Sequence, residues 1–229
     1  MGAMRLAALF SGGKDSTLAI QLAEAMGHHV DYLITVKAAS EESYYFHYPN
    51  IWVTSLQARA MGRRQIMVSA RSASRDDELR ALRDAVELIR DEVDGLLSGV
   101  NRSRSQHDSF QRICDELGLK FLTPLWMRDP REVLEGVVSS GIIAMIVGVA
   151  AMGLGRELLG RIIDHELISL LNSLSERYDV NVLGEGGEFE TLVLDSPLFK
   201  KRIKILEYEI RWSGYSGMLL VREARLAEK

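Results

Sequence analysis

The chain has 229 residues, of which 47% are hydrophobic and 26% charged, and its formal net charge is −4. This composition is typical of a globular protein with a buried core, and the acidic balance argues against a nucleic-acid partner such as tRNA. A single cysteine, Cys114, excludes an intramolecular disulfide and a cysteine zinc cluster. The longest apolar run, residues 141–155, is shorter than the about 20 residues that span a bilayer, and no signal peptide is evident. We therefore expect a cytoplasmic protein without a membrane segment.

The first half of the chain alternates short apolar runs with amphipathic segments. The apolar runs predict five strands, at residues 6–10, 30–38, 63–70, 94–100 and 119–126. Apolar residues at three- and four-residue steps predict the intervening helices, which begin near residue 15 and cover 53–62, 76–93 and 109–118. Repeated strand–helix units of this length form right-handed crossovers in a parallel sheet covered on both faces. The sequence thus predicts an α/β, doubly wound, Rossmann-like domain.

The regular alternation of predicted strands and helices ends after Trp126. Helices are predicted at residues 130–141, with Pro130 in the first turn, and at 156–178, with a buried strand at 142–150 between them. Three strand-like pieces follow, at Thr191–Leu194, Ile203–Ile210 and Met218–Arg222. We therefore predict two domains: residues 1–128, and a smaller α+β domain of residues 129–229.

The corner between the first strand and the first helix reads SGGKDS, residues 11–16. Glycines at this position let the backbone approach a ligand, while the helix N-terminus, two hydroxyl groups and a lysine favour an anion. The spacing is not that of a Walker A loop. The alternative is a plain turn followed by an aspartate or serine helix cap. Because all six residues occur together, we interpret residues 11–16 as a phosphate loop.

A second motif, EGGEFET, occupies residues 185–191 and holds three carboxylates around a glycine pair. Gly186 and Gly187 indicate a tight turn or a bulge. If a strand follows, Glu188 and Glu190 share one face. The motif is then either a solvated hairpin with acidic edges, or a carboxylate cluster that binds a cation or supplies a general base.

SGGKDS resembles the phosphate-binding PP-loop of ATP pyrophosphatases. Together with LQARAMG, ESYYFH, GLGRELLGRIID, EGGEFET and LDSPLF, it resembles the diphthine–ammonia ligase family over nearly the whole chain, from about Met4 to Lys204. The resemblance implies an AMP-forming ligase that adenylates the carboxylate of diphthine on translation elongation factor 2. Ammonium then displaces AMP to give diphthamide. The implied cofactors are ATP and Mg²⁺, and the sequence leaves a homodimer open.

The resemblance also assigns residues, position by position. Those implied to bind the phosphates of ATP are Ser11, Gly12, Gly13, Lys14, Asp15 and Ser16. Those implied to act in catalysis are Lys14, Asp15, Glu185, Glu188 and Glu190, with Asp15 also holding Mg²⁺. Those implied to bind the substrate are Glu42, His47, Asn50, Gln57, Ser103, Gln106, Gly186 and Gly187. His47 is equally consistent with a buried or capping histidine. Trp126, Arg128 and Asp129 also match the family, and the alternative is that they only join the two domains, with Asp129 as a helix cap.

The sequence departs from the family after the fourth strand, where the family pattern is close to S-x-Y-Q-R-x-R-x-E. Ser103 and Gln106 are in register, but His107 and Ser109 stand where the family has arginines. Arg102 and Arg104 are nearby candidates to replace them, although arginine is hard to replace in a bidentate contact. This departure keeps two alternatives open: a divergent enzyme that amidates another carboxylate, and a nucleotide-binding module without turnover. A tRNA-modifying PP-loop enzyme is disfavoured by the acidic charge and the missing cysteine pair.

Overall fold

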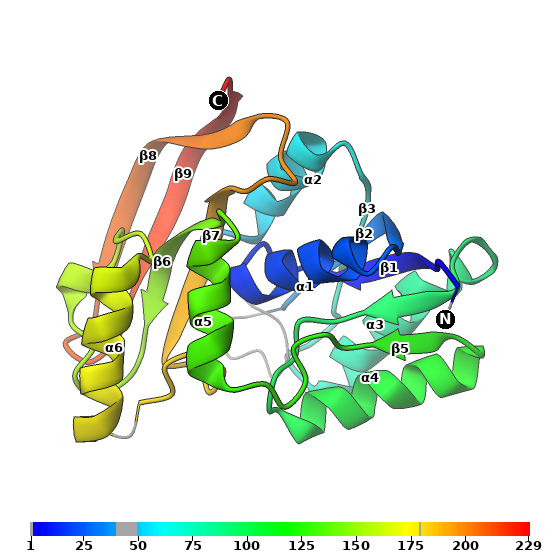
Figure 1. Ribbon diagram of the computed structural model, residues 1–229, viewed down its shortest axis with the longest axis horizontal. Helices are drawn as coiled ribbons and strands as arrows, with labels where there is room; N and C mark the ends of the chain where they lie inside the picture. The colour runs from blue at the N-terminus through cyan, green and yellow to red at the C-terminus, as the bar shows by residue number, and fades with distance from the viewer. Residues whose placement is uncertain (1, 40–49, 179) are drawn as a thin grey trace.

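The computed structural model describes residues 2–39, 50–178 and 180–229, and it contains two sheets (Figure 1). The first is a parallel sheet in the order β3-β2-β1-β4-β5. Its strands are β1 (Arg5–Leu9), β2 (His29–Lys37), β3 (Arg64–Ser69), β4 (Gly95–Leu97) and β5 (Lys120–Leu122). The chain runs outward from β1 to β3 and then returns to β4, so the strand order reverses between β1 and β4. The predicted doubly wound fold is confirmed, and its switch point is where such sheets bind ligands.

Helices cover both faces of this sheet, because its central strand is apolar on both sides. Leu6 and Ala8 of β1 belong to one core cluster, while Ala7 and Leu9 belong to another. The first cluster includes α1 (Lys14–Ala25) and α2 (Thr54–Met61). The second includes α3 (Arg75–Glu87) and α4 (Arg104–Leu117).

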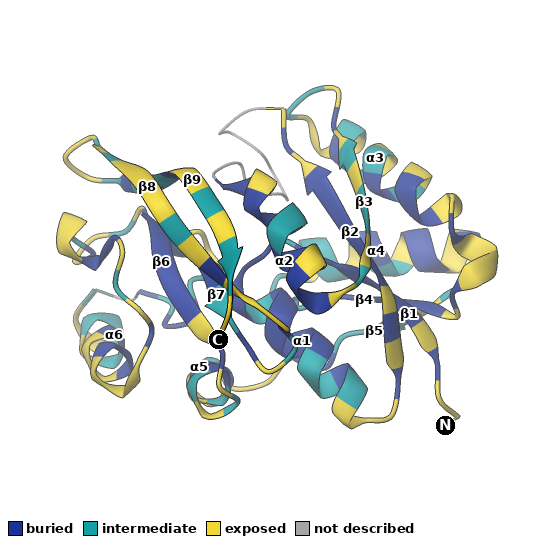
Figure 2. Ribbon diagram, turned by 90° about the horizontal axis from the view of Figure 1, so that it is seen from above, coloured by how far each residue is buried: buried dark blue, intermediate teal, exposed yellow. Residues whose placement is uncertain are grey.

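The second sheet is antiparallel, in the order β7-β6-β9-β8. Its strands are β6 (Ile143–Val149), β7 (Phe189–Asp195), β8 (Arg202–Trp212) and β9 (Gly217–Ala227). The central strand β6 is buried, whereas the outer strand β8 is exposed over most of its length (Figure 2). Two helices accompany this sheet, α5 (Pro130–Ser139) and α6 (His165–Tyr178). None of the helices in the described part of the chain is long and apolar enough to cross a membrane.

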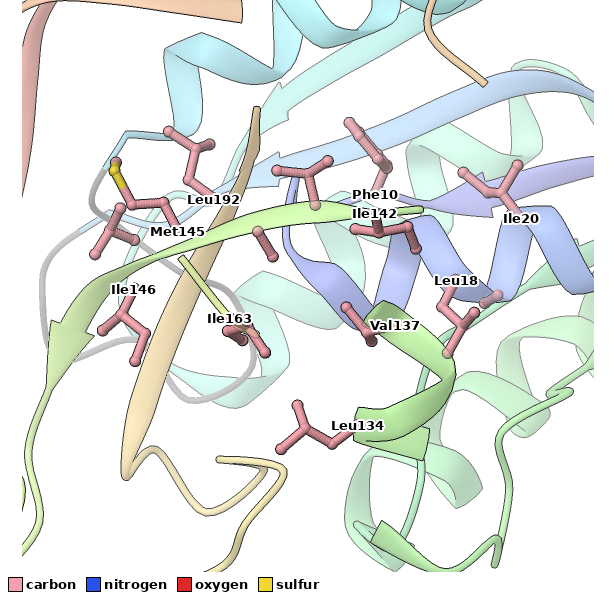
Figure 3. Close-up of a cluster of buried hydrophobic side chains, with 14 of the residues drawn as sticks. Phe10, Leu18, Ile20, Leu134, Val137, Ile142, Met145, Ile146, Ile163 and Leu192 are labelled. Carbon is pink, nitrogen blue, oxygen red and sulfur yellow. The ribbon is translucent and has the colours of Figure 1, made fainter. Parts of the chain in front are cut away.

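One hydrophobic core joins the two sheets. Leu18 and Ile20 of α1 lie in the same cluster as Val137 of α5 and Ile146 of β6 (Figure 3). The cluster therefore continues across residue 128, where the sequence predicts a domain boundary. Helix α1, which begins directly after the phosphate loop, is packed between the parallel sheet and α5 (Figure 1).

Local signals explain the beginning of α5. Asp129 accepts hydrogen bonds from the backbone N–H groups of Arg131 (2.8 Å) and Glu132 (3.4 Å), and Pro130 occupies the first turn. A side-chain acceptor and a proline at these positions are favourable because the first N–H groups of a helix have no partner within it. The predicted cap at Asp129 is confirmed.

Two predicted helices are shorter in the structure. The helix predicted for residues 76–93 ends at Glu87, and a 3₁₀ turn at Arg90–Glu92 follows it, although Ile89 and Val93 are buried as expected. The helix predicted for residues 156–178 begins only at His165, after a 3₁₀ turn at Arg156–Leu158.

Pairing with β6 accounts for the second difference. Gly160 donates to the carbonyl of Ile146 (2.9 Å), and the N–H of Ile146 donates to the carbonyl of Arg161 (2.8 Å). Gly160 has φ +91°, a left-handed conformation that glycine adopts without strain. The backbone hydrogen bonds of this segment are thus made with a strand, and α6 starts where Asp164 accepts from the N–H of Leu167 (2.8 Å).

Candidate functional site

The phosphate loop connects β1 to α1, and its own side chains shape it. The N-cap of α1 is Gly13, and no side chain caps the helix, so the alternative of an aspartate or serine cap is wrong. Instead, the hydroxyl groups of Ser16 and Thr17 donate to the carbonyl of Gly13 (3.1 and 2.9 Å), and the N–H of Gly13 donates to Ser11 Oγ (3.3 Å). Residues 11–16 therefore form a compact loop at the helix N-terminus, where the dipole favours an anion.

The second sheet supports this loop from outside. The carbonyl of Gly12 accepts from the N–H of Val193 on β7 (2.9 Å), and Lys14 N donates to Thr191 Oγ1 (3.1 Å). A Cβ atom on Gly13 would lie 3.2 Å from the carbonyl oxygen of Thr191. The predicted need for glycine thus comes from the close approach of β7 as well as from the turn.

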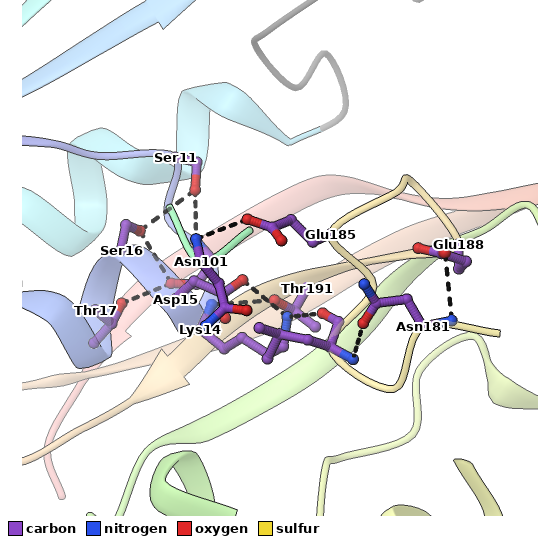
Figure 4. A network of polar contacts seen from close by, with 12 residues as sticks. Ser11, Lys14, Asp15, Ser16, Thr17, Asn101, Asn181, Glu185, Glu188 and Thr191 are labelled. Carbon is purple, nitrogen blue, oxygen red and sulfur yellow. Dashed lines mark hydrogen bonds and ion pairs between the residues drawn. The ribbon is translucent and has the colours of Figure 1, made fainter. Parts of the chain in front are cut away.

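A cavity of about 550 Å³ opens between the phosphate loop, the loop after β4 and the start of β7. Its polar lining comes from all three segments, which are far apart in the sequence but adjacent in space (Figure 4). The polar residues in this lining are Ser11, Lys14, Asp15, Ser16, Asn50, Ser98, Asn101, Ser103, Ser105, Gln106, Glu185, Glu190 and Thr191. Apolar side chains, among them Ile34, Val36 and Phe110, complete it. A mixed lining of this kind is typical of a small-molecule site.

Lys14 joins the phosphate loop to the segment before β7, residues 180–188, which we call the acidic loop. The Lys14 side chain is only 3% exposed, and its Nζ donates to Asp15 Oδ2 (2.9 Å) and to the carbonyl of Leu183 (2.6 Å). It also lies 5.0 Å from the centre of the Phe189 ring. The positive charge at the cavity wall is thus fixed in position by contacts on two sides.

The three glutamates of EGGEFET have different surroundings. Glu185 lies against the loop after β4, where its carboxylate accepts from the backbone N–H groups of three successive residues. Glu188 precedes β7 and accepts from Gly186 N (2.8 Å) and Asn181 N (3.4 Å), while Glu190 lines the cavity. Glu188 does not line the cavity, because its carboxylate holds the acidic loop together. That Glu188 and Glu190 share one face stays a prediction.

Family profiles match both halves of the chain. Residues 4–121 match the diphthamide synthase N-terminal domain, and residues 129–227 match the diphthamide synthase C-terminal domain. The chain belongs to the diphthamide synthase family. The resemblance noted in the sequence is thereby confirmed, and membership of this family makes the protein an ATP-dependent ligase.

Curated relatives named diphthine–ammonia ligase extend over nearly the whole chain. The human protein is 35% identical over 90% of this chain and 85% of its own length. The zebrafish protein, from Danio rerio, is 37% identical over 88% of this chain and 86% of its own length. Among solved structures, a predicted subunit of tRNA methyltransferase from Methanocaldococcus jannaschii is similar at 18% identity and a TM-score of 0.47. That match covers 85% of this chain and 98% of the other.

Two positions that the resemblance assigns to substrate binding make hydrogen bonds within the protein. Gln57 is 0% exposed, and its Nε2 donates to the carbonyls of Gly12 (2.9 Å) and Val193 (2.7 Å), so it supports the phosphate loop from behind. Asn50 lines the cavity, but its side-chain amide bonds the carbonyl of Leu219 and the N–H of Val221 on β9 (2.8 and 2.7 Å). Glu42 and His47, which were also expected to bind substrate, lie outside the described residues.

The remaining expected substrate positions are at the cavity. Ser103, Gln106, Gly186 and Gly187 all line it. Gly187 has φ +88° and donates to the carbonyl of Gly184 (3.1 Å), which confirms the predicted tight turn.

The positions at which this family member lacks arginines have their own partners. The ring of His107 stacks on Trp126, with centroids 4.0 Å apart. The buried Ser109 hydroxyl accepts from Arg75 Nη2 of α3 (2.8 Å). Arg102 and Arg104, the candidates named from the sequence, are exposed and do not line the cavity. Arg75 thus contacts α4 at one of these positions, and sequence analysis missed it because 34 residues separate it from Ser109.

Sequence analysis also missed Gly99, Asn101 and Thr191. A Cβ on Gly99 would lie 2.7 Å from the backbone of Asp15, so the loop after β4 touches the phosphate loop. Asn101 is 1% exposed, and its Nδ2 donates to the carbonyls of Leu125 (2.7 Å) and Arg128 (3.1 Å). Thr191 is the last residue of the EGGEFET motif, and its place in that motif was the only sequence feature that could have indicated its contact with the phosphate loop.

Proposed function

We propose that this ligase amidates diphthine on translation elongation factor 2. Its curated relatives are named diphthine–ammonia ligase, which supports the reaction. A carboxylate oxygen of diphthine attacks the α-phosphorus of ATP, and pyrophosphate leaves. Ammonia then attacks the acyl carbon of the adenylate, loses a proton and expels AMP, so that the products are diphthamide, AMP and pyrophosphate. We propose the cytoplasm as the location of the enzyme, because translation factors are found there.

The observation that carries the proposal is the cavity between the phosphate loop and EGGEFET. Both motifs line it, although 169 residues separate Ser16 from Glu185. The phosphate loop offers hydroxyl groups, a helix N-terminus and Lys14 to the leaving pyrophosphate, and charge that develops there is stabilised by donors already in place. Glu190 lines the same cavity, where its negative charge favours the trimethylammonium group of diphthine.

The residues present also fit Mg²⁺. No group of three or more His, Cys, Asp or Glu side chains could hold a metal ion anywhere in the described part of the chain, but a metal bound through nucleotide phosphates needs few protein ligands. Asp15 Oδ1 is buried at the cavity and has no hydrogen-bond partner among the described residues. This oxygen would hold Mg²⁺, which when bound neutralises charge on the phosphate oxygens.

The test is an end-point reaction with ATP, Mg²⁺, ammonium and elongation factor 2 that carries diphthine. We expect AMP together with a carboxylate-to-amide mass change on the factor. Asp15→Asn should abolish both, whereas Asp31→Asn, an exposed aspartate on β2, should not.

Two other results would overturn the proposal. Production of AMP without the mass change would favour a different carboxylate substrate, in line with His107 and Ser109 at the family's arginine positions. If no AMP forms, the nucleotide-binding module without turnover is favoured.

A further inference from the structure

The side chain of Gln57 on α2 joins the two halves of the chain behind the phosphate loop. Its Nε2 donates one hydrogen bond to the carbonyl of Gly12 (2.9 Å) and one to the carbonyl of Val193 on β7 (2.7 Å). The N–H of Val193 also donates to the carbonyl of Gly12 (2.9 Å). Gly12 lies in the N-terminal family domain and Val193 in the C-terminal one, so this three-way contact fixes one domain against the other.

The chemistry of this contact requires an uncharged side chain with two donors. The carbonyls of Gly12 and Val193 only accept hydrogen bonds, so the atom between them must supply two hydrogens. Gln57 is 0% exposed, and a lysine or arginine buried there without a carboxylate partner would be costly. A primary amide supplies both hydrogens without a charge, and the two carbonyls also determine which end of the amide faces them.

Stability alone does not account for this amide. Gln57 Oε1 is buried and has no hydrogen-bond partner among the described residues, which costs free energy. Gln65 on β3 is a contrasting case, because both ends of its amide are paired. Its Nε2 donates to the hydroxyl groups of Thr35 (2.9 Å) and Thr54 (2.8 Å), and its Oε1 accepts from Ser55 (2.9 Å). A buried polar group that is left partly unpaired is more often explained by function than by stability.

The strand that Gln57 holds carries residues of the cavity wall. Glu190 and Thr191 precede Val193 on β7, and both line the cavity. At about 3.4 Å per residue, they lie within about 10 Å of Val193 along the strand. A change in the position of Val193 would therefore move these side chains relative to the phosphate loop.

We propose that Gln57 is a positioning residue, which fixes β7 relative to the phosphate loop and so aligns the substrate carboxylate with the α-phosphate of ATP. This inference rests on the proposed function, which supplies the two reactants. Without Gln57 the loop keeps its own hydrogen bonds from Ser16 and Thr17 to the carbonyl of Gly13, so ATP still binds. The rate falls instead, because a misplacement of about 1 Å between reacting groups can cost about 100-fold.

The experiment compares Gln57→Met with Gln65→Met. Methionine has nearly the same size and no donor, so each variant loses buried hydrogen bonds to α2 or from it while the packing is kept. Both variants should melt at a lower temperature than the wild type. Kinetics are then measured with ATP and diphthine-bearing elongation factor 2 at a temperature where both variants are folded.

The expected result is a change in kcat that only one variant shows. For Gln57→Met, kcat for AMP formation should fall at least about tenfold, while the Kd for ATP stays within about threefold of the wild type. Gln65→Met should keep kcat within about twofold. An unchanged kcat for Gln57→Met overturns the proposal. Equal losses of kcat in the two variants also overturn it, because they would assign the effect to stability. A loss of ATP affinity that accounts for the whole loss of activity would place Gln57 in ATP binding instead.

A measurement on the wild-type protein covers the remaining cases. If Gln57→Met does not fold, or if the wild type forms no AMP, nuclear magnetic resonance decides. The signals of the Gln57 side-chain amide and the Val193 N–H should shift together on saturation with ATP, because one contact holds both the loop and the strand. If neither signal shifts, Gln57 does not couple them and the proposal fails. Lack of AMP formation by the wild type counts against the proposed function alone.

Discussion

Gly12→Ala tests whether the phosphate loop is held by packing as well as by backbone conformation. Gly12 has φ +80°, and a Cβ there would overlap Gln57 Oε1 and lie 3.0 Å from Thr54 Cγ2. Gly27, at the end of α1, has almost the same conformation, φ +85°, but a Cβ there meets nothing within 4 Å. The two alanine variants therefore share the conformational cost and differ in the steric cost.

The two costs have different sizes. An alanine forced into the left-handed region costs about 1–2 kcal/mol, which is the loss of stability expected for Gly27→Ala. Overpacking adds about 1–3 kcal/mol, so Gly12→Ala should lose about 2–5 kcal/mol. Because Gln57 is fully buried and held by two carbonyl groups, the loop is the part that moves. ATP binding should then weaken at least about tenfold for Gly12→Ala alone.

Urea unfolding measures the stability of both variants, and a calorimetric titration measures their affinity for ATP. The double variant Gly12→Ala with Gln57→Ala should recover about 1 kcal/mol or more relative to the sum of the single changes, because the overlap is gone. Equal losses of stability for Gly12→Ala and Gly27→Ala, with unchanged ATP affinity, would refute the steric argument.

Three further changes are expected to have distinct effects. Asp15→Asn removes the charge beside the buried Lys14 ammonium, so it should abolish AMP formation. Because the Asp15 side chain is partly exposed, stability should fall by only about 1 kcal/mol in a thermal melt, and unchanged stability would contradict a contribution of this ion pair. Gln57→Glu puts a carboxylate against two carbonyl oxygens, and its loss of about 2–4 kcal/mol in urea should shrink as the pH falls and the carboxyl group protonates. Burial raises the pKa of the Cys114 thiol to about 12. The unfolded thiol ionises first, so stability should fall by about 1.4 kcal/mol per pH unit above pH ~9, and Cys114→Ala should remove this slope.

The strands and most helices could be predicted because their signals are local. Buried parallel strands are uninterrupted apolar runs, and amphipathic helices repeat at three and four residues. The prediction of one helix over residues 156–178 was wrong at its beginning. The apolar residues before His165 also fit the three- and four-residue repeat, although they are not helical. The backbone hydrogen bonds of this segment with Ala144 and Ile146 show instead that it pairs with β6. Pairing between distant segments leaves no mark on a short window of sequence.

The same distinction separates the predicted from the unpredicted parts of the site. The phosphate loop is six consecutive residues, and its chemistry was visible at once. The contact of Glu185 with the backbone N–H groups of residues 101–103 joins residues 82–84 positions apart, and backbone donors have no residue type to reveal them. Gln57 was singled out through the family pattern, but its role as a clamp required the positions of Gly12 and Val193.

The carbonyl of Gly12 has a consequence for how the protein is made. It accepts from Val193 N and from Gln57 Nε2, and Gln57 binds Val193 as well. A nascent chain that has emerged only as far as the first sheet lacks one of these three partners. The phosphate loop therefore reaches its final shape only when most of the polypeptide has left the ribosome. We therefore expect an incomplete product of translation to carry the SGGKDS sequence without a finished nucleotide site.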